Sequence, residues 1–178
     1  MDLGDTELVL IDLGAGKNRL GGSALAQVHG QLGDSAPDVD DPEKLAAFFG
    51  AVQLLNARGQ VVAYHDRSDG GLFATVCEMA FAGRCGATLY LDNLAIDPSQ
   101  LDVDGHERQT DVLAGRLSER ILAVLFNEEL GAVLQVRRSE RAAVMQALRD
   151  AGLSRESHVI GQPNAEGQLR VIVNNKLV

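Results

Sequence analysis

The order in which strand-like and helix-like segments follow one another constrains the fold of this chain more than any other feature. Short apolar runs rich in β-branched residues predict strands, and apolar positions three or four residues apart predict helices. Along the chain these patterns give strand, helix, helix, strand, helix, strand, a polar stretch, strand, helix, strand and strand. Strands and helices therefore mix without the strict alternation of a doubly wound parallel sheet. This order favours an α+β fold built in layers around a mixed β-sheet.

The segments behind that order are short and separated by turn residues. The predicted strands are Glu7–Asp12, Val61–Tyr64, Ala87–Leu91, Leu130–Val136, His158–Gly161 and Leu169–Val173. The predicted helices are Ser23–Gly30, Pro42–Arg58, Gly71–Ala82 and Ser139–Ala151. Asp41 and Ser139 are good N-cap residues for the helices that they begin. In the second helix, apolar residues at helical spacing predict a buried stripe of Leu45, Phe48, Phe49, Val52 and Leu55.

The stretch from Asp92 to Arg120 differs from the rest of the chain. It is rich in acidic residues and poor in the apolar residues that build a core. A structureless loop of this length is unusual inside a compact domain. We therefore interpret 92–120 as an insertion, mobile at least from Asp102 to Thr110, within a single domain that spans 1–178.

Composition is that of a globular protein from a reducing compartment. The 178 residues suffice for one sizeable core, 46% are hydrophobic, and an aromatic content of 4% leaves aliphatic residues to build that core. The net charge of −9 argues against nucleic-acid binding. The sequence shows neither an apolar run of membrane-spanning length nor a signal peptide. We expect a cytoplasmic protein, not bound to a membrane, in which Cys77 and Cys85 stay reduced.

The strongest candidate for chemistry is the turn from His65 to Gly71, which reads His-Asp-Arg-Ser-Asp-Gly-Gly between a strand and a helix. Glycines allow close backbone approach, and the start of a helix offers free N–H groups to phosphate. Asp66 and Asp69 provide the hard oxygen ligands that magnesium prefers, and Ser68 can donate a hydrogen bond to phosphate. The alternative is a structural turn in which Ser68 or Asp69 caps the helix and nothing binds.

Two further segments could contact a ligand. Leu13–Ser23 carries two pairs of glycines, but their spacing matches neither the dinucleotide fingerprint nor the P-loop. Its last residues, Gly21-Gly22-Ser23, open a helix and could hold a phosphate or a carboxylate, or form a tight loop capped by Ser23. Asn127-Glu128-Glu129-Leu130-Gly131 places two acids before a strand. These acids either reach a ligand or belong to a solvated loop.

Taken in this order, the three segments resemble phosphoribosylformylglycinamidine synthase, also called FGAM synthetase. The likeness rests on Asp12–Gly14 with Leu20–Gln27, Tyr64–Leu72 with Glu78–Gly83, and Leu125–Gly131. It covers nearly the whole chain except 92–120. It is closest to the second C-terminal domain, of the aminoimidazole ribonucleotide synthetase type, in the large single-chain bacterial enzyme. The resemblance implies a three-layer α/β/α arrangement around the mixed sheet.

The resemblance also implies an activity and the residues that serve it. Enzymes of this family use ATP and glutamine to convert formylglycinamide ribonucleotide to formylglycinamidine ribonucleotide in purine biosynthesis. By this resemblance Asp66 is a magnesium ligand and Ser68 contacts ATP or ADP, while Gly70 and Gly71 are weaker candidates for nucleotide contact. The expected cofactors are ATP or ADP and Mg²⁺. The expected partners are the ATPase-type and glutaminase domains of the parent enzyme and its small-molecule substrate.

The family's glutaminase domain and N-terminal ATPase-type domains have no counterpart in these 178 residues. The chain alone is therefore expected to be inactive, and to supply one wall of a catalytic or a structural nucleotide site that other domains complete. The alternative is a stand-alone binding or scaffold domain of the same fold. The related aminoimidazole, selenophosphate and thiamine-phosphate enzymes are not expected to carry Asn127–Gly131 beside this turn.

Overall fold

A computed structural model describes residues 1–95 and 111–178, with the backbone alone for 111–115. Within these residues, seven strands form one sheet in the order β2-β4-β1-β5-β3-β6-β7. The strands are β1 (Thr6–Asp12), β2 (Ala63–Asp66), β3 (Gly86–Tyr90), β4 (Gly131–Arg137), β5 (Ser157–Asn164), β6 (Leu169–Val173) and β7 (Lys176–Leu177). Neighbouring strands are antiparallel except β3 and β6, which are parallel. The expected mixed sheet is therefore confirmed.

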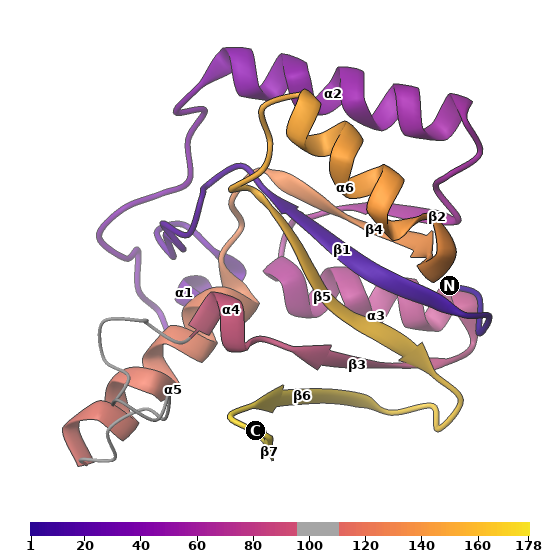
Figure 1. The fold of residues 1–178 in the computed structure, drawn as a ribbon. Helices are drawn as coiled ribbons and strands as arrows, with labels where there is room; N and C mark the ends of the chain where they lie inside the picture. The colour runs from indigo at the N-terminus through magenta and orange to yellow at the C-terminus, as the bar shows by residue number, and fades with distance from the viewer. Residues whose placement is uncertain (96–110) are drawn as a thin grey trace, which may run out of the picture.

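Helices cover both faces of this sheet (Figure 1). On one face lie α2 (Pro42–Ala57) and α6 (Arg141–Asp150), and on the other lie α3 (Gly71–Gly83), α4 (Asp92–Ala95) and α5 (Asp111–Phe126). The short helix α1 (Ala24–Val28) belongs to the connection between β1 and α2, and a 3₁₀ turn, η2 (Arg138–Glu140), precedes α6. The three-layer arrangement implied by the resemblance is confirmed.

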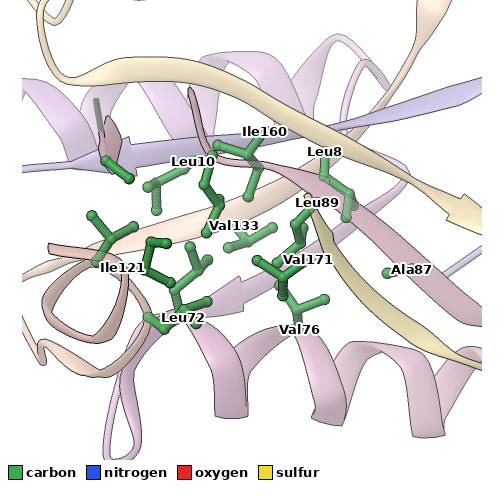
Figure 2. Close-up of a cluster of buried hydrophobic side chains, with 14 of the residues drawn as sticks. Leu8, Leu10, Leu72, Val76, Ala87, Leu89, Ile121, Val133, Ile160 and Val171 are labelled. Carbon is green, nitrogen blue, oxygen red and sulfur yellow. The ribbon is translucent and has the colours of Figure 1, made fainter. Parts of the chain in front are cut away.

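The interior strand β1 explains why both faces of the sheet need a helical layer. Successive side chains of a strand point to opposite faces. Leu8 and Leu10 accordingly belong to the core under α3 and α5, which Figure 2 shows, whereas Val9 and Ile11 belong to the core under α2 and α6. All four side chains are buried. A short strand that is apolar at every position is suited to burial on both faces.

The buried stripe predicted for α2 is partly wrong. Leu55 is fully buried and Ala51 nearly so, but Phe49 is 65% exposed. Only one side of α2 faces the sheet, and Phe49 lies outside that side. Helical spacing fixed the period of the stripe, but the packing of the helix decided how wide the buried side is.

The predicted start of the last helix also needs correction. Ser139 does not cap α6, because it lies inside the 3₁₀ turn η2. Glu140 holds the N-cap position and makes no side-chain capping bond. The Arg141 N–H instead donates to the Arg138 carbonyl, in the i→i+3 pattern that commonly satisfies free N–H groups at helix ends.

The acidic stretch 92–120 contains regular structure at both ends. It begins with α4, and α5 starts at Asp111, ten residues before the apolar run that the sequence suggested. Ile121, Val124 and Leu125 of α5 are buried in the core shared with α3. The part expected to be mobile, Asp102–Thr110, lies outside the described residues.

The two cysteines lie in the described part of the chain. Cys77 is partly buried and Cys85 buried, and both are free thiols, as predicted. Burial raises the pKa of the Cys77 thiol, which keeps it protonated and unreactive. Among the helices of the described residues, none is long and apolar enough to cross a bilayer.

Candidate functional site

The three segments singled out in the sequence meet at one end of the sheet. β1 ends at Asp12, β2 ends at Asp66, and β4 begins at Gly131. The strand register pairs Asp12 with Gly131 and Asp66 with Ala132. Because β1 and β2 are both antiparallel to β4, the ends of the first two strands lie beside the start of the third. The topology therefore brings all three segments together.

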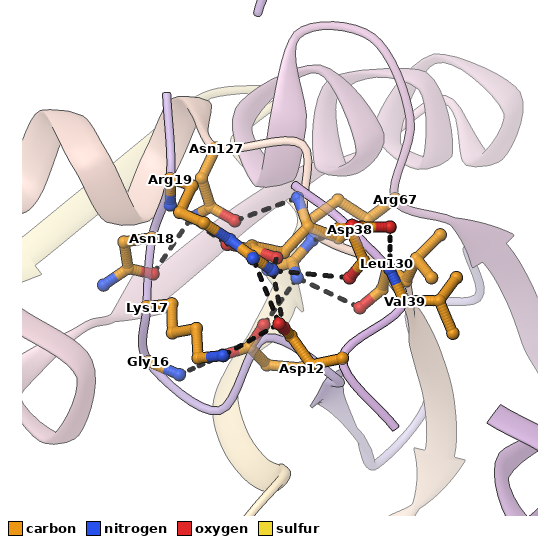
Figure 3. Close-up of polar contacts among 12 residues, drawn as sticks. Asp12, Gly16, Lys17, Asn18, Arg19, Asp38, Val39, Arg67, Asn127 and Leu130 are labelled. Atoms are coloured by element: carbon orange, nitrogen blue, oxygen red, sulfur yellow. Dashed lines mark hydrogen bonds and ion pairs between the residues drawn. The ribbon is translucent and has the colours of Figure 1, made fainter. Parts of the chain in front are cut away.

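The side chain of Arg67 connects the His-Asp-Arg-Ser turn to the other two segments through hydrogen bonds and an ion pair (Figure 3). Its buried guanidinium donates to Asp12 Oδ1 at 2.5 Å, to the Glu129 carbonyl at 2.6 Å and to the Leu130 carbonyl at 3.2 Å. Asp12 Oδ2 also accepts the Gly16 N–H at 2.8 Å. The ion pair with Asp12 thus connects the turn to the end of β1 and the loop after it. The two bonds to carbonyls connect the turn to the segment before β4.

The inward direction of Arg67 determines where its neighbours point. In an extended segment, residues on either side of a buried one face the opposite way. Asp66 and Ser68 are both exposed, whereas Arg67 is buried. The structure therefore presents the predicted magnesium ligand and the predicted nucleotide contact on the exposed side of the turn.

Tyr64 orients the carboxylate of Asp66. Its hydroxyl donates to Asp66 Oδ1. Burial, and then this hydrogen bond, raises the pKa of Tyr64, so the hydroxyl keeps its proton. A carboxylate has about four lone-pair positions, so Asp66 can accept this bond and still ligate a cation.

The expected alternative, a helix capped by Ser68 or Asp69, is wrong. The N-cap of α3 is Gly70, which has a left-handed φ of 82° and makes no side-chain capping bond. Gly71 also has a positive φ, and a Cβ there would lie 2.6 Å from the Asn127 carbonyl oxygen. Both glycines therefore shape the turn, and Gly71 lets α3 start directly against the segment before β4.

Glu128 supplies the acceptor that caps α3. Its Oε1 accepts the Gly70 N–H and the Ala24 N–H, each at 2.8 Å. At the start of α1, Ser23 accepts the Ala26 N–H at 3.2 Å. Gly21-Gly22-Ser23 is therefore a tight loop capped by its serine. Glu128, a carboxylate of the same chain, accepts from Ala24, the first residue of the helix that this loop opens.

A second group of charges joins the loop after β1 to the linker before α2. Arg19 donates to both carboxylate oxygens of Glu129 at 2.7 Å, and to Asp40 at 2.7 Å. Lys17 pairs with Asp40 at 2.9 Å. The hydrogen bond to Glu129, and then the bond to Asp40, raises the pKa of Arg19. The bonds from Lys17 and Arg19 lower the pKa of Asp40, so both Arg19 and Asp40 are charged at neutral pH.

The buried members of this network were not predicted from the sequence. Asn127 and Glu129 are fully buried, so a solvated loop is the wrong description of their segment. Arg67 and Asp12 were not singled out because charged residues are mostly exposed. One signal could have identified Arg67. It stands between two residues with ligand character in an extended segment, and must therefore point away from the ligand side.

Among the described residues, no three His, Cys, Asp or Glu side chains are grouped so that they could hold a metal ion. A magnesium ion at Asp66 would have to complete its shell with phosphate oxygens, water or ligands from elsewhere. Magnesium commonly binds in this way, through one or two carboxylates together with substrate phosphates. The donor set of the turn therefore suits a cation that arrives with a phosphorylated ligand.

The fold and the site together define a class, a mixed-sheet α+β domain with candidate ligand residues in the turns at one end of the sheet. More particularly, the chain belongs to the family of the AIR synthase related protein, C-terminal domain, whose family model matches residues 6–174.

Solved structures share this fold. The chain aligns over 100% of its length with Thermotoga maritima PurL complexed with ATP, at a TM-score of 0.67 and 16% identity, and covers 25% of PurL. The structure of PurLQS from the same organism gives a TM-score of 0.68 at 15% identity, with the same coverage. E. coli HypE, a hydrogenase maturation protein, aligns with 98% of the chain at a TM-score of 0.59 and 21% identity. The chain covers 48% of HypE. The chain thus spans about a quarter of the length of PurL.

Proposed function

We propose that this chain is a domain of a phosphoribosylformylglycinamidine synthase and contributes part of a magnesium–nucleotide site. The observation that carries the proposal is the exposed pair Asp66 and Ser68, set in place by the buried Arg67 between them. Family membership supports it. The fold shared with PurL, for which structures complexed with ATP, ADP and AMPPCP are known, supports it further.

In this proposal Asp66 ligates Mg²⁺ and Ser68 donates a hydrogen bond to a phosphate oxygen of ATP or ADP. The bound cation supplies positive charge that offsets the charge of the phosphates. Gly70 and Gly71 shape the turn around these contacts, and direct nucleotide contact by either glycine stays a prediction. Because a single carboxylate leaves most of an octahedral shell open, residues of other domains complete the site, and the isolated chain is inactive.

The parent enzyme proposed here acts in purine biosynthesis in the cytoplasm. It converts formylglycinamide ribonucleotide, glutamine, ATP and water to formylglycinamidine ribonucleotide, glutamate, ADP and phosphate. ATP phosphorylates the glycinamide carbonyl oxygen of the ribonucleotide. Ammonia released by hydrolysis of glutamine then adds to that carbon, and the oxygen leaves as part of the phosphate. This chain holds part of either the catalytic or the structural nucleotide site, beside ATPase-type and glutaminase domains.

The reading frame of the parent gene gives the first test. We expect the translation to contain ATPase-type domains of the same family and a glutaminase domain. Their absence on both sides would favour the alternative of a stand-alone binding or scaffold domain.

Activity of the purified parent protein gives the second test. We expect it to form formylglycinamidine ribonucleotide only when ATP, glutamine and the ribonucleotide are all present. At limiting Mg²⁺, Asp66→Asn is expected to lower the rate at least about tenfold, because a cation ligand is lost. Asp69→Asn, in the same exposed turn, is the matched control and should retain the rate, because the ligand proposed here is Asp66, whereas Asp69 is proposed to shape the turn. Equal rates for both variants and the unmodified protein would contradict the assignment of Asp66.

A further inference from the structure

The side chains of Tyr64 and Asp66 lie on the same side of β2. One position separates the two residues, and alternate residues of a strand face the same way. Both are exposed, and the Tyr64 hydroxyl donates to Asp66 Oδ1. In the strand register they stand opposite Leu134 and Ala132 of β4, which are fully buried. The sheet therefore fixes the backbone that carries both the donor and the acceptor.

Two further bonds hold the backbone at Asp66. Its carbonyl accepts from the Thr75 hydroxyl of α3 at 3.3 Å, and the following N–H, that of Arg67, donates to the Gly131 carbonyl at 2.9 Å. The freedom that Asp66 keeps is rotation of its side chain, and the bond from Tyr64 restricts this rotation. Within the described residues the carboxylate accepts this bond at Oδ1 alone, so Oδ2 keeps its lone pairs for a cation.

Coordination through one oxygen and through both oxygens of a carboxylate suits different cations. Ca²⁺ has a larger, more flexible shell and accepts both oxygens of one carboxylate, whereas Mg²⁺ demands near-ideal octahedral geometry, which two-oxygen binding distorts. To bind a cation through both oxygens, Asp66 would have to bring it beside the Tyr64 hydroxyl, whose donated hydrogen carries partial positive charge. The hydroxyl therefore opposes the two-oxygen mode open to Ca²⁺ and permits the one-oxygen mode that suits Mg²⁺.

We propose that Tyr64 is a positioning residue that makes the site at Asp66 select Mg²⁺ over Ca²⁺. It acts by holding the Asp66 carboxylate so that a single oxygen faces the cation. Tyr64 has this role only if Asp66 is the cation ligand, so the inference rests on the proposed function. It adds the choice of cation, and assigns that choice to a side chain that does not touch the ion itself.

Removal of the hydroxyl tests this role in the parent protein. Tyr64→Phe keeps the ring and deletes the donor to Asp66. The matched control is Tyr90→Phe, which deletes the hydroxyl of the other tyrosine in the chain, at a similar exposure of 47% against 41%. Tyr90 ends β3, and three strands separate β3 from β2 in the sheet. ADP is titrated calorimetrically in saturating Mg²⁺ or Ca²⁺ at constant ionic strength, and the site is identified as the one that Asp66→Asn weakens.

We expect Tyr64→Phe to lower the ratio of ADP affinity in Mg²⁺ to ADP affinity in Ca²⁺ at least about threefold, as the loss of one hydrogen bond would. Mg²⁺ loses a ligand held in place for it, and Ca²⁺ gains access to both oxygens. Tyr90→Phe should keep the ratio of the unmodified protein. An unchanged ratio in Tyr64→Phe would overturn the inference, including the case in which affinity falls equally with both cations, as a purely structural role predicts.

Failure of this inference is distinguishable from failure of the proposed function. A Tyr64→Phe protein with an unchanged ratio would remove the role of Tyr64, while the loss of magnesium-dependent ADP affinity in Asp66→Asn would still assign the cation to Asp66. An Asp66→Asn protein with full magnesium-dependent ADP affinity would instead remove the proposed function, and with it the role of Tyr64.

Discussion

At the scale of single residues, the geometry of the turn depends most on Arg67. Its side chain is 1% exposed and pairs with Asp12, whose side chain is 3% exposed. Removing one partner of a buried ion pair leaves an uncompensated buried charge, which is more costly than losing both partners. The ion pair between Arg67 and Asp12 therefore holds the exposed residues Asp66 and Ser68 in position.

Replacement of Arg67 should accordingly destabilise the fold. Arg67→Met is expected to lower the free energy of unfolding by about 3–5 kcal/mol, because Asp12 stays buried without its partner. Denaturant unfolding measures this loss. Arg170→Met, which breaks an exposed pair with Glu166, should cost no more than about 1 kcal/mol. The double variant Asp12→Asn/Arg67→Met should recover part of the loss, and a double variant that loses the sum of both single effects would argue against direct coupling.

His158 makes the stability depend on pH. Burial lowers the pKa of His158 below the ordinary value of 6.5, although Asp12 and Glu156 act in the opposite direction. His158 is therefore protonated at a higher pH in the unfolded chain than in the folded chain. The stability that results is present above pH 6.5 and is lost as the pH falls toward the lower native pKa.

Unfolding measurements between neutral and mildly acidic pH test this dependence. In that range His158→Gln should flatten the fall in stability, while His29→Gln, at an exposed position, should leave it unchanged. An unaltered slope in His158→Gln would show that other groups carry the dependence.

At the scale of elements, the start of α3 depends on a glycine for two separable reasons. Gly71 has a φ of 66°, which is strained for other residues, and a Cβ there would meet the Asn127 carbonyl oxygen at 2.6 Å. Gly152 has a φ of 77°, but a Cβ there would meet nothing within 4 Å. A substitution at Gly152 therefore measures the cost of the left-handed backbone conformation without any steric clash of the added Cβ.

We expect Gly152→Ala to cost about 1–2 kcal/mol from left-handed backbone strain alone. Gly71→Ala should cost a further 1–3 kcal/mol or so, because the methyl group overpacks against the segment before β4. Thermal or denaturant unfolding of both variants measures the difference. Equal losses would mean that the segment before β4 moves aside without cost.

Elements with a strong apolar pattern were predictable from the sequence, and details set by tertiary contacts were not. The predicted strand Glu7–Asp12 begins one residue later than β1. The predicted strand Leu130–Val136 begins and ends one residue earlier than β4. The expected strand His158–Gly161 is longer in the structure, because β5 continues through Pro163 to pair with β3. Similarly, the fully buried Glu129 looked like a loop residue because its partner, Arg19, is 110 positions away in sequence.

At the scale of the whole molecule, one sheet supports two cores and carries the site at its end. β1 contributes to both cores, and its last residue, Asp12, begins the charged network that fixes the turn. Element order was enough to predict the mixed sheet, since local patterns determine the elements. The convergence of three distant segments was not readable from spacing, because it follows from antiparallel pairing across β4.

Magnesium-dependent binding of ADP to the parent protein tests the central claim most directly. Calorimetric titration with and without Mg²⁺ would compare the unmodified protein, Asp66→Asn and the control Asp69→Asn. We expect Asp66→Asn to lose the magnesium-dependent part of the affinity at one nucleotide site, at least about tenfold, while Asp69→Asn keeps it. Retention of full magnesium-dependent ADP affinity in Asp66→Asn at every nucleotide site would contradict the assignment of this turn to a magnesium–nucleotide site.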